Sequence, residues 1–213
     1  MPKRETTPRA MHAGRLSSGG VSMIVLTGPS GSGKSTLAKR LAAAGWMHLD
    51  GDQLAKSLYK PKSALMRSLV RAFGSRVLGK QGFLDAHALG EIVFSSPARM
   101  RALNRLVHPR FLAALRKEIR KARLSGRALV ADVPVYYELG APNLGLPVVL
   151  VQAPLKLRVA RLKAAGLTAR RAALRARSLR FGPAERAQAD CVIDGSRTPA
   201  RSWADLQRFL RAA

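Results

Sequence analysis

Apolar runs alternate with helical patterns along most of this chain. Short apolar runs that end in glycine or polar residues predict strands at 21–28, 46–50, 127–132, 146–153 and 189–195. Helical spacing predicts helices at 36–45, 155–165 and 203–212, together with a mostly helical region at about 53–125. Strands that alternate with helices are typical of an α/β fold with a parallel sheet covered by helices on both faces.

Proline and glycine divide the long helical region. We expect breaks near Pro61, between Gly74 and Gly82, and near Pro97 and Pro109, because proline lacks a backbone donor and glycine favours turns. A second basic stretch follows the helix at 155–165, and we interpret about 155–186 as a basic lid.

The first 22 residues are polar and basic and contain no apolar segment of a secretory signal. We interpret 1–22 as a disordered basic tail ahead of one domain at 23–213. The alternatives for this tail are an organelle address, a polyanion-binding arm, or a start codon upstream of the true one at Met23.

No apolar run approaches the ~20 residues that a membrane-spanning helix needs, so we expect no membrane span and a cytoplasmic location. The single cysteine, Cys191, excludes an internal disulfide and is predicted to be a small core residue.

The charge is strongly unbalanced. The chain has 38 Lys and Arg against 12 Asp and Glu, which gives a formal net charge of +26. Such an excess attracts polyanions, so nucleic acid, nucleotides and anionic membrane are candidate partners. The alternative is an arginine-rich composition with few surface acids and no polyanion partner.

A phosphate-binding loop is the clearest motif. The sequence GPSGSGKS at 28–35 fits G-x-x-x-x-G-K-[ST], directly after a predicted strand and at the start of a predicted helix. Its glycines let backbone N–H groups turn toward phosphate oxygens, and the helix dipole favours negative charge there. Lys34 is expected to reach the β- and γ-phosphates and Ser35 to bind Mg²⁺. The expected nucleotide-binding residues are Gly28, Ser30, Gly31, Ser32, Gly33, Lys34, Ser35 and Thr36.

Three acids stand where predicted strands end. Asp50 and Asp52 close the second strand and Asp132 ends the third. In open α/β sheets ligands bind outside the carboxyl ends of the strands, where a carboxylate can accept a hydroxyl proton or help to hold Mg²⁺. The alternatives are a helix N-cap for either of the first two, and a turn residue ahead of Pro134 for Asp132.

The motifs together resemble the dephospho-CoA kinase family through most of the chain after Val21. The matching segments are the loop at 27–35, Asp50-Gly51-Asp52, Phe73-Gly74, GFLDAHALGEIVF at 82–94, Leu103-Asn104, His108-Pro109, PVYYE at 134–138 and ADCVIDG at 189–195. The loop alone is shared by many kinases, whereas the ordered set at family spacing is much more specific.

The resemblance implies a three-layer P-loop kinase fold with an acceptor-binding region at about 53–125. It implies transfer of the γ-phosphoryl group of ATP, with Mg²⁺, to the ribose 3′-hydroxyl of dephospho-CoA. It implies catalytic roles for Asp52, Lys34 and Asp50. The acceptor is expected to bind to Asp52, His108, Pro134 and Glu138. The metal is expected to bind to Ser35 and Asp132.

The sequence departs from the family pattern in the lid. Ala164 and Ala165 stand where the family has an arginine and an aspartate. The cations that could replace this arginine are Arg161, Lys163, Arg170, Arg171 and Arg175. Other departures are Ala86 for an arginine, Tyr136 and Tyr137 for small or apolar residues, and Gly195 for an asparagine.

These departures leave two alternatives to a true dephospho-CoA kinase. One is a divergent P-loop kinase with another small hydroxyl acceptor, and the other is a weakly active paralogue that binds nucleotides or nucleic acid. Nucleic acid is not the favoured partner, because no aromatic platform accompanies the basic lid. We therefore expect a small-molecule substrate and a monomer or weak oligomer.

Overall fold

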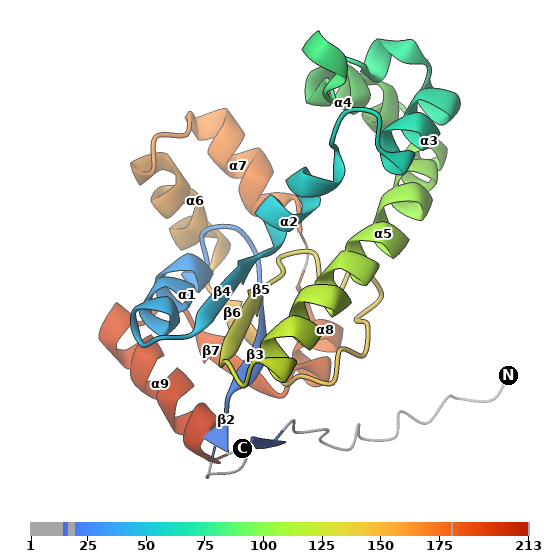
Figure 1. Cartoon of the computed structure of the whole chain (residues 1–213). Coiled ribbons are helices and arrows are strands. Elements are labelled where there is room, and N and C mark those ends of the chain that lie inside the picture. Colours follow the sequence, from blue (N-terminus) through green and yellow to red (C-terminus); the bar gives the residue numbers. More distant parts are fainter. Residues whose placement is uncertain (1–14, 17–19, 180, 213) are drawn as a thin grey trace, which may run out of the picture. The chain divides into compact units, whose positions relative to one another are not determined.

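The chain divides into two compact units in the computed structural model, which describes residues 15–16, 20–179 and 181–212 (Figure 1). The first unit contains the described residues up to Leu49 and those from Ala122 onward, and the second runs from Asp50 to Lys121. Since only the second unit is continuous in sequence, it is an insertion within the first.

A five-stranded sheet forms the centre of the first unit. Its strands, in spatial order, are β4 (Met47–Asp50), β5 (Leu129–Asp132), β3 (Met23–Thr27), β6 (Val148–Gln152) and β7 (Cys191–Asp194). β3 pairs in parallel with β5 and β6, and β6 pairs in parallel with β7. Every residue of β3 is buried, as expected for a parallel strand covered on both faces. The predicted parallel sheet is confirmed.

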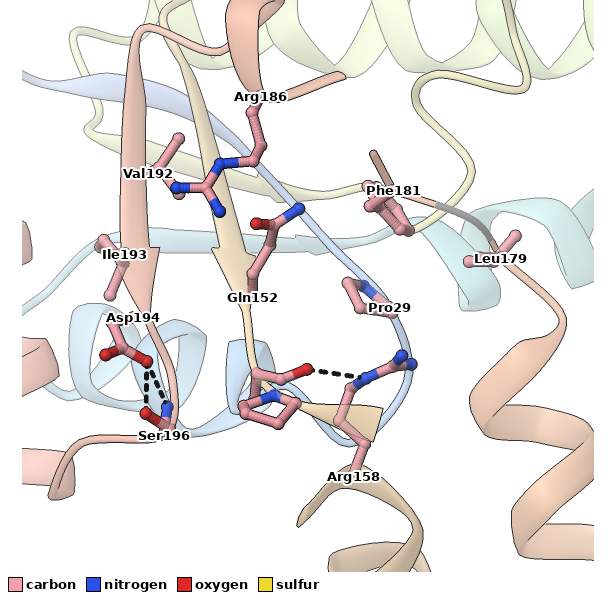
Figure 2. Close-up of a pocket in the computed structure, with 12 residues that line it drawn as sticks. Pro29, Gln152, Arg158, Leu179, Phe181, Arg186, Val192, Ile193, Asp194 and Ser196 are labelled. Atoms are coloured by element: carbon pink, nitrogen blue, oxygen red, sulfur yellow. Dashed lines mark hydrogen bonds between the residues drawn. The ribbon is translucent and has the colours of Figure 1, made fainter. Parts of the chain in front are cut away.

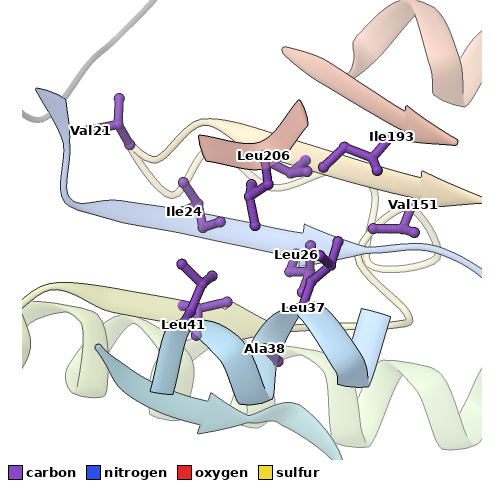
Figure 3. Packing of buried hydrophobic residues seen from close by; sticks show 11 residues of the cluster. Val21, Ile24, Leu26, Leu37, Ala38, Leu41, Val151, Ile193 and Leu206 are labelled. Atoms are coloured by element: carbon purple, nitrogen blue, oxygen red, sulfur yellow. The ribbon is translucent and has the colours of Figure 1, made fainter. Parts of the chain in front are cut away.

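α1 (Lys34–Ala43) and α9 (Pro199–Ala212) pack against this sheet. The other helices of the first unit are α6 (Leu155–Ala164) and α7 (Ala169–Arg177), which contact each other, and α8 (Pro183–Gln188). Leu37 and Leu41 lie one turn apart on α1 and pack with Leu206 of α9 against Ile24 and Leu26 of β3 (Figure 3). Each leucine buried in this way contributes about 1.5–3 kcal/mol. This core holds the start of α1, and therefore the preceding loop, against the end of β3.

The second unit is helical and has an apolar cluster of its own. Its elements are α2 (Gly51–Leu58), α3 (Ala64–Phe73), η1 (Ser75–Val77), η2 (Lys80–Gly82), α4 (Ala86–Phe94) and most of α5 (Pro97–Leu124). The cluster comprises Leu65, Met66, Leu69, Val77, Leu89 and Val93. The breaks predicted near Pro61, at 74–82 and near Pro97 lie between these helices.

The break predicted near Pro109 is wrong, because α5, which is 28 residues long, runs through this proline. The guanidinium of Arg110 donates to the carbonyl of Leu106 at 2.7 Å and to the hydroxyl of Ser68 on α3 at 3.3 Å. The contact with Ser68 attaches this part of α5 to α3, and such tertiary contacts help to offset the ~3 kcal/mol that proline costs inside a helix.

The ends of the chain also differ from the expectations. The last helix begins at Pro199 rather than at residue 203, because Thr198 accepts a hydrogen bond from the N–H of Arg201 and proline is tolerated in a first turn. Most of the predicted tail, residues 1–14 and 17–19, lies outside the described residues. β1 (Arg15–Leu16) pairs antiparallel with β2 (Gly20–Val21). Among the described residues, no helix is long and apolar enough to cross a membrane.

Candidate functional site

The loop between β3 and α1 depends on its glycines. Gly28, Gly31 and Gly33 have φ of 137°, 79° and 107°, values that residues with a Cβ rarely adopt. A Cβ on Gly28 would lie 2.1 Å from the carbonyl oxygen of Val151, and one on Gly31 would lie 2.8 Å from that of Arg158. The glycines therefore supply both the backbone conformation and the space in which the loop passes β6 and α6.

Lys34 is folded onto this loop. Its side chain is only 7% exposed, and its Nζ donates to the carbonyls of Gly28 at 2.6 Å and Pro29 at 3.2 Å. Ser32 is buried, whereas Ser35 and Thr36, in the first turn of α1, are exposed. A buried ammonium among backbone groups at a helix N-terminus is suited to binding an anion.

Arg161 of α6 contacts the same loop. Its Nη1 donates to the carbonyls of Gly31 at 3.3 Å and Ser32 at 3.4 Å. The other four cations proposed to replace the missing lid arginine, Lys163, Arg170, Arg171 and Arg175, are exposed. Of the five candidates, Arg161 is the one that the structure places against the phosphate loop.

Asp132 lies beside β3 at the end of β5. It is half-buried and pairs in register with Leu26, two residues before the loop begins. Together with the Ser35 hydroxyl it offers one carboxylate and one neutral oxygen. The described residues contain no group of three or more His, Cys, Asp or Glu that could hold a metal. A carboxylate and a hydroxyl are oxygen donors of the kind that Mg²⁺ takes when it is bound to nucleotide phosphates.

A pocket of about 550 Å³ adjoins the loop at Pro29. Its walls come from the end of β6, the start of α6, the segment before α8, and β7 with the turn after it (Figure 2). The lining residues are Pro29, Gln152, Ala153, Pro154, Arg158, Leu179, Phe181, Arg186, Val192, Ile193, Asp194 and Ser196. This volume and mixture of apolar and polar groups are typical of small-ligand pockets.

Arg158 is fixed at one side of this pocket. Its Nε donates to the carbonyl of Ala153 at 3.0 Å and its Nη1 to that of Ala176 in α7. Burial lowers the pKa of the guanidinium from its usual value, but arginine remains charged in proteins. The pocket therefore keeps a positioned positive charge next to Pro29.

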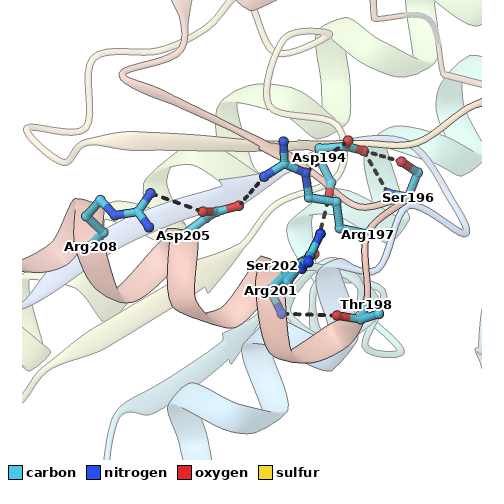
Figure 4. Close-up of polar contacts among 8 residues, drawn as sticks. All are labelled: Asp194, Ser196, Arg197, Thr198, Arg201, Ser202, Asp205 and Arg208. Carbon is cyan, nitrogen blue, oxygen red and sulfur yellow. Dashed lines mark hydrogen bonds and ion pairs between the residues drawn. The ribbon is translucent and has the colours of Figure 1, made fainter.

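The turn after β7 is held by a polar network (Figure 4). The Asp194 carboxylate accepts from the N–H and the hydroxyl of Ser196 at 2.9 and 2.6 Å, which lowers its pKa. Arg197 lies between this carboxylate, at 3.5 Å, and that of Asp205 in α9, at 3.3 Å. The Ser202 hydroxyl donates to the Asp194 carbonyl at 3.1 Å. The end of β7 is thereby attached to α9, and Asp194 at this end also lines the pocket.

The residues after β5 place Pro134 and Glu138 in the first unit. The Pro134 carbonyl accepts a hydrogen bond from the hydroxyl of Thr27, just before the loop, at 3.3 Å. Glu138 is exposed, and the loss of part of its hydration to neighbouring protein atoms raises the pKa of its carboxyl. The segment that begins with Pro134 is therefore attached to the strand that leads into the phosphate loop.

Three predicted site residues belong to the second unit. Asp50 is the N-cap of α2, where its Oδ1 accepts from the N–H groups of Asp52 at 2.9 Å and Gln53 at 3.0 Å. Asp52 is exposed in the first turn of that helix. His108 is half-buried in α5, and burial lowers its pKa, which favours the neutral ring. Of the two aspartates considered as a helix N-cap, Asp50 makes the cap, and Asp52 is exposed.

Sequence reasoning did not identify the pocket. Gln152, Arg158, Phe181 and Arg186 carried no motif, and Asp194 was noted only as part of a family segment. The one available indication was position, because Gln152 and Asp194 end two predicted strands, and ligands bind at such ends.

Comparisons with known proteins agree with this arrangement. The family model described as dephospho-CoA kinase matches residues 22–200. The chain is 34% identical over 195 residues to dephospho-CoA kinase of Thermobifida fusca. This match covers 88% of this chain and 97% of that protein. It is 36% identical over 193 residues to dephospho-CoA kinase of Symbiobacterium thermophilum, with coverage of 90% and 81%.

Solved structures agree as well. The crystal structure of TT1252 from Thermus thermophilus has a TM-score of 0.71 and 34% identity, and it covers 89% of this chain and 94% of that one. Dephospho-CoA kinase from Campylobacter jejuni has a TM-score of 0.67 at 20% identity and covers 90% and 98%, which supports the fold. These similarities extend through both units.

Proposed function

The chain belongs to the dephospho-CoA kinase family, and from that premise we propose that it phosphorylates the ribose 3′-hydroxyl of dephospho-CoA with ATP, giving coenzyme A and ADP. The observation that carries this proposal is the match of the family model across residues 22–200, which contain both the phosphate loop and the inserted helical unit. The described geometry then suggests how the chain's own residues do this work.

We assign the nucleotide to the first unit. The phosphates bind in the loop, where the Lys34 ammonium exchanges its contacts with the carbonyls of Gly28 and Pro29 for phosphate oxygens. The base is assigned to a second pocket, of about 150 Å³, which adjoins the start of α1 and is lined by Ser32, Gly33, Thr36, Arg161 and Gly195 among others. Arg158, fixed beside Pro29, adds positive charge close to the phosphates.

Mg²⁺ bound to ATP would supply neutralisation of the phosphate charge. Ser35 and Asp132 supply the two protein oxygens that would hold it. Both lie near the carboxyl end of the sheet, at the start of α1 and the end of β5.

The acceptor is assigned to the residues that the family resemblance implies for it. We propose that Asp52 accepts the proton of the 3′-hydroxyl as that oxygen bonds to the γ-phosphorus and the bond to the β-phosphate oxygen breaks. Asp50 fixes the first turn of α2, on which Asp52 stands. His108, Pro134 and Glu138 are proposed to contact the acceptor. A neutral His108 suits hydrogen bonding to a hydroxyl or an amide.

Product formation tests this function directly. Purified protein with Mg-ATP and dephospho-CoA should yield coenzyme A and ADP in equal amounts by chromatography. Lys34→Ala should lower the rate by at least ~10²-fold, because it removes a charge that stabilises the transferred phosphoryl group. Lys39→Ala removes an exposed lysine of α1 and is the matched control. ATP binding without coenzyme A formation would reject the acceptor and require a screen of other hydroxyl compounds.

The remaining expectations stay predictions. They concern the cytoplasmic location, the monomeric or weakly oligomeric state, the lid role of about 155–186 and the acceptor role of about 53–125. Nucleic acid is not favoured as a partner, since the family match accounts for both units without one.

A further inference from the structure

The pocket at Pro29 is distinct from the pocket to which the base is assigned. The two pockets share none of their lining residues. Val151 of β6 lines the smaller pocket, and Gln152, the next residue, lines the larger one. Because successive side chains of a strand point to opposite faces of its sheet, the two pockets lie on opposite sides of the end of β6. The base therefore leaves the larger pocket, of about 550 Å³, without an assigned ligand.

The charged side chains of this larger pocket favour an anion. The guanidiniums of Arg158 and Arg186 line it together with the carboxylate of Asp194 (Figure 2). That carboxylate already accepts two hydrogen bonds from Ser196 and lies 3.5 Å from Arg197. Since these contacts balance its negative charge, the guanidiniums dominate the pocket and suit a phosphate or a carboxylate.

An aromatic ring forms part of the apolar wall. The rings of Phe181 and Tyr137 are 5.8 Å apart at an interplanar angle of 79°, and those of Tyr137 and Tyr136 are 5.2 Å apart at 80°. Tyr136 is 1% exposed, so this edge-to-face row is anchored in the core. The family pattern has small or apolar residues at 136 and 137, so this support belongs to this chain's own sequence. Phe181 therefore offers a fixed apolar surface in the same pocket as the guanidiniums.

The larger pocket also adjoins the phosphate loop. Pro29 lines it, and the carbonyl of Pro29 accepts a hydrogen bond from Lys34 at 3.2 Å. The carbonyl oxygen of Arg158 packs so closely on Gly31 that a Cβ there would lie 2.8 Å from it. The Arg158 guanidinium also donates to the carbonyl of Ala176 and so attaches α7. A ligand that binds Arg158 therefore lies next to the loop that is proposed to hold the phosphates of ATP.

We propose that the larger pocket is a second binding site, which takes a small organic anion with an apolar group, and that this ligand lowers the affinity of the loop for ATP. The anion pairs with Arg158 and Arg186, and its apolar group packs on Phe181. ATP affinity falls because two anions near one loop repel each other, and because the ligand neutralises the Arg158 charge. ATP binding thus responds to an anion that is neither substrate, whichever acceptor the enzyme uses.

The charge requirement is tested with phenyl phosphate and benzoate, which both join an anion to a ring and differ in the anion. Calorimetric titration of the full chain, saturated with Mg²⁺ and a non-hydrolysable ATP analogue, measures their binding outside the loop and the base pocket. Arg186→Gln should weaken the tighter probe about tenfold, as expected for one lost charged hydrogen bond. Arg201→Gln removes an exposed charge of α9 outside the pocket and is the matched control, which should leave probe affinity unchanged.

The apolar requirement is tested with Phe181→Leu. This variant should weaken binding of the tighter probe about threefold and leave binding of inorganic phosphate unchanged, because only the contact with the ring is lost. Phe83→Leu replaces a 53% exposed ring in the second unit and is the control, which should change neither ligand.

The effect on the loop is measured separately. A saturating probe should raise the dissociation constant of the ATP analogue about fivefold, and the analogue should raise that of the probe by the same factor, because coupling between two sites is reciprocal. An analogue affinity that the probe leaves unchanged would reject the effect on the loop.

Other results would overturn the second site itself. They are no binding of either probe to the saturated protein, or equal probe affinities of Arg186→Gln and Arg201→Gln. Complete displacement of the probe by dephospho-CoA would also overturn it, because the pocket would then belong to the acceptor site. Coenzyme A formation by the wild type is a separate measurement, so the proposed function can fail while the second site stands, and the reverse.

Discussion

Among the described glycines outside the phosphate loop, Gly195 is the one at which an added Cβ would lie closest to another atom. A Cβ there would lie 1.9 Å from the carbonyl oxygen of Ser32 and 3.1 Å from Cγ1 of Val151. The N–H of Gly195 donates to the Gln152 carbonyl at 2.7 Å, which ties its backbone to β6. The turn after β7 and the phosphate loop are therefore in backbone contact, and the family's asparagine has no room in this chain.

Gly195→Ala should lower the free energy of unfolding by about 1–3 kcal/mol, the usual cost of forcing a group into a packed site. It should also weaken ATP binding, because Ser32 must move to accommodate the methyl group. Urea unfolding followed by tryptophan fluorescence and calorimetric titration with ATP measure the two effects. Gly90→Ala, where a Cβ meets only the Phe94 ring at 3.5 Å, is the control and should not destabilise the protein. Equal stabilities of the two variants would contradict the predicted clash.

Cys191 should be an unreactive thiol. Burial, with the negative charges of Asp205 and Asp190, raises its pKa to about 11. At pH 8 only roughly a thousandth of it is thiolate, so a disulfide reagent should react about a hundredfold more slowly than with a free cysteine. Because the chain has a single cysteine, absorbance of the released thiolate reports on Cys191 alone. Full reactivity should appear in denaturant, and rapid labelling of the folded protein would contradict the prediction.

The start of α2 is the element that combines a structural and a proposed catalytic role. Asp50 caps the helix and Asp52 lies in its first turn. Asp50→Ala should remove about 1 kcal/mol of stability, which lowers the melting temperature by roughly 2–4 °C in a chain of this size. Asp50→Asn should preserve the cap and the melting temperature, because asparagine is an equally good N-cap.

Turnover of these two variants separates the roles of Asp50. If its charge contributes to catalysis, kcat falls in Asp50→Asn although the melting temperature is unchanged. If only the cap matters, Asp50→Asn keeps its kcat and Asp50→Ala loses part of it through disorder around Asp52. Full activity of Asp50→Asn would therefore reject a catalytic role for the Asp50 carboxylate. Scanning calorimetry and initial rates of coenzyme A formation provide the two measurements.

At the scale of the whole molecule, the main feature is uncompensated positive charge. The formal net charge is +26, and residues 155–179, which form α6 and α7, contain no Asp or Glu. The described residues show few acid–base pairs, and the Lys121–Glu118, Arg197–Asp205 and Arg208–Asp205 pairs all leave the cation largely exposed. The protein therefore presents a positive field to an anionic substrate such as ATP.

This field predicts a marked salt dependence of ATP binding. Raising KCl from about 50 to 500 mM shortens the screening length from roughly 14 to 4 Å, which confines attraction to charges in direct contact. The dissociation constant for Mg-ATP should then rise about three- to tenfold, as measured by calorimetry at the two salt concentrations. An Arg170→Gln/Arg175→Gln double variant, which removes two exposed charges of α7, should show a smaller salt effect. A constant affinity across this range would show that local contacts alone determine binding.

The sequence by itself determined those elements whose formation depends on residues close to one another along the chain. The phosphate loop, the five strands and α1 follow from glycine conformation, hydrophobic period and helix-start rules, each of which acts within about ten residues. The order of family motifs also indicated the fold and the reaction. Tertiary structure alone decided which strands are neighbours, that α5 passes through Pro109, and that Arg161 rather than Lys163 contacts the loop. The pocket at Pro29 was likewise decided by packing, because its walls come from four segments between Pro29 and Ser196 that no local pattern relates.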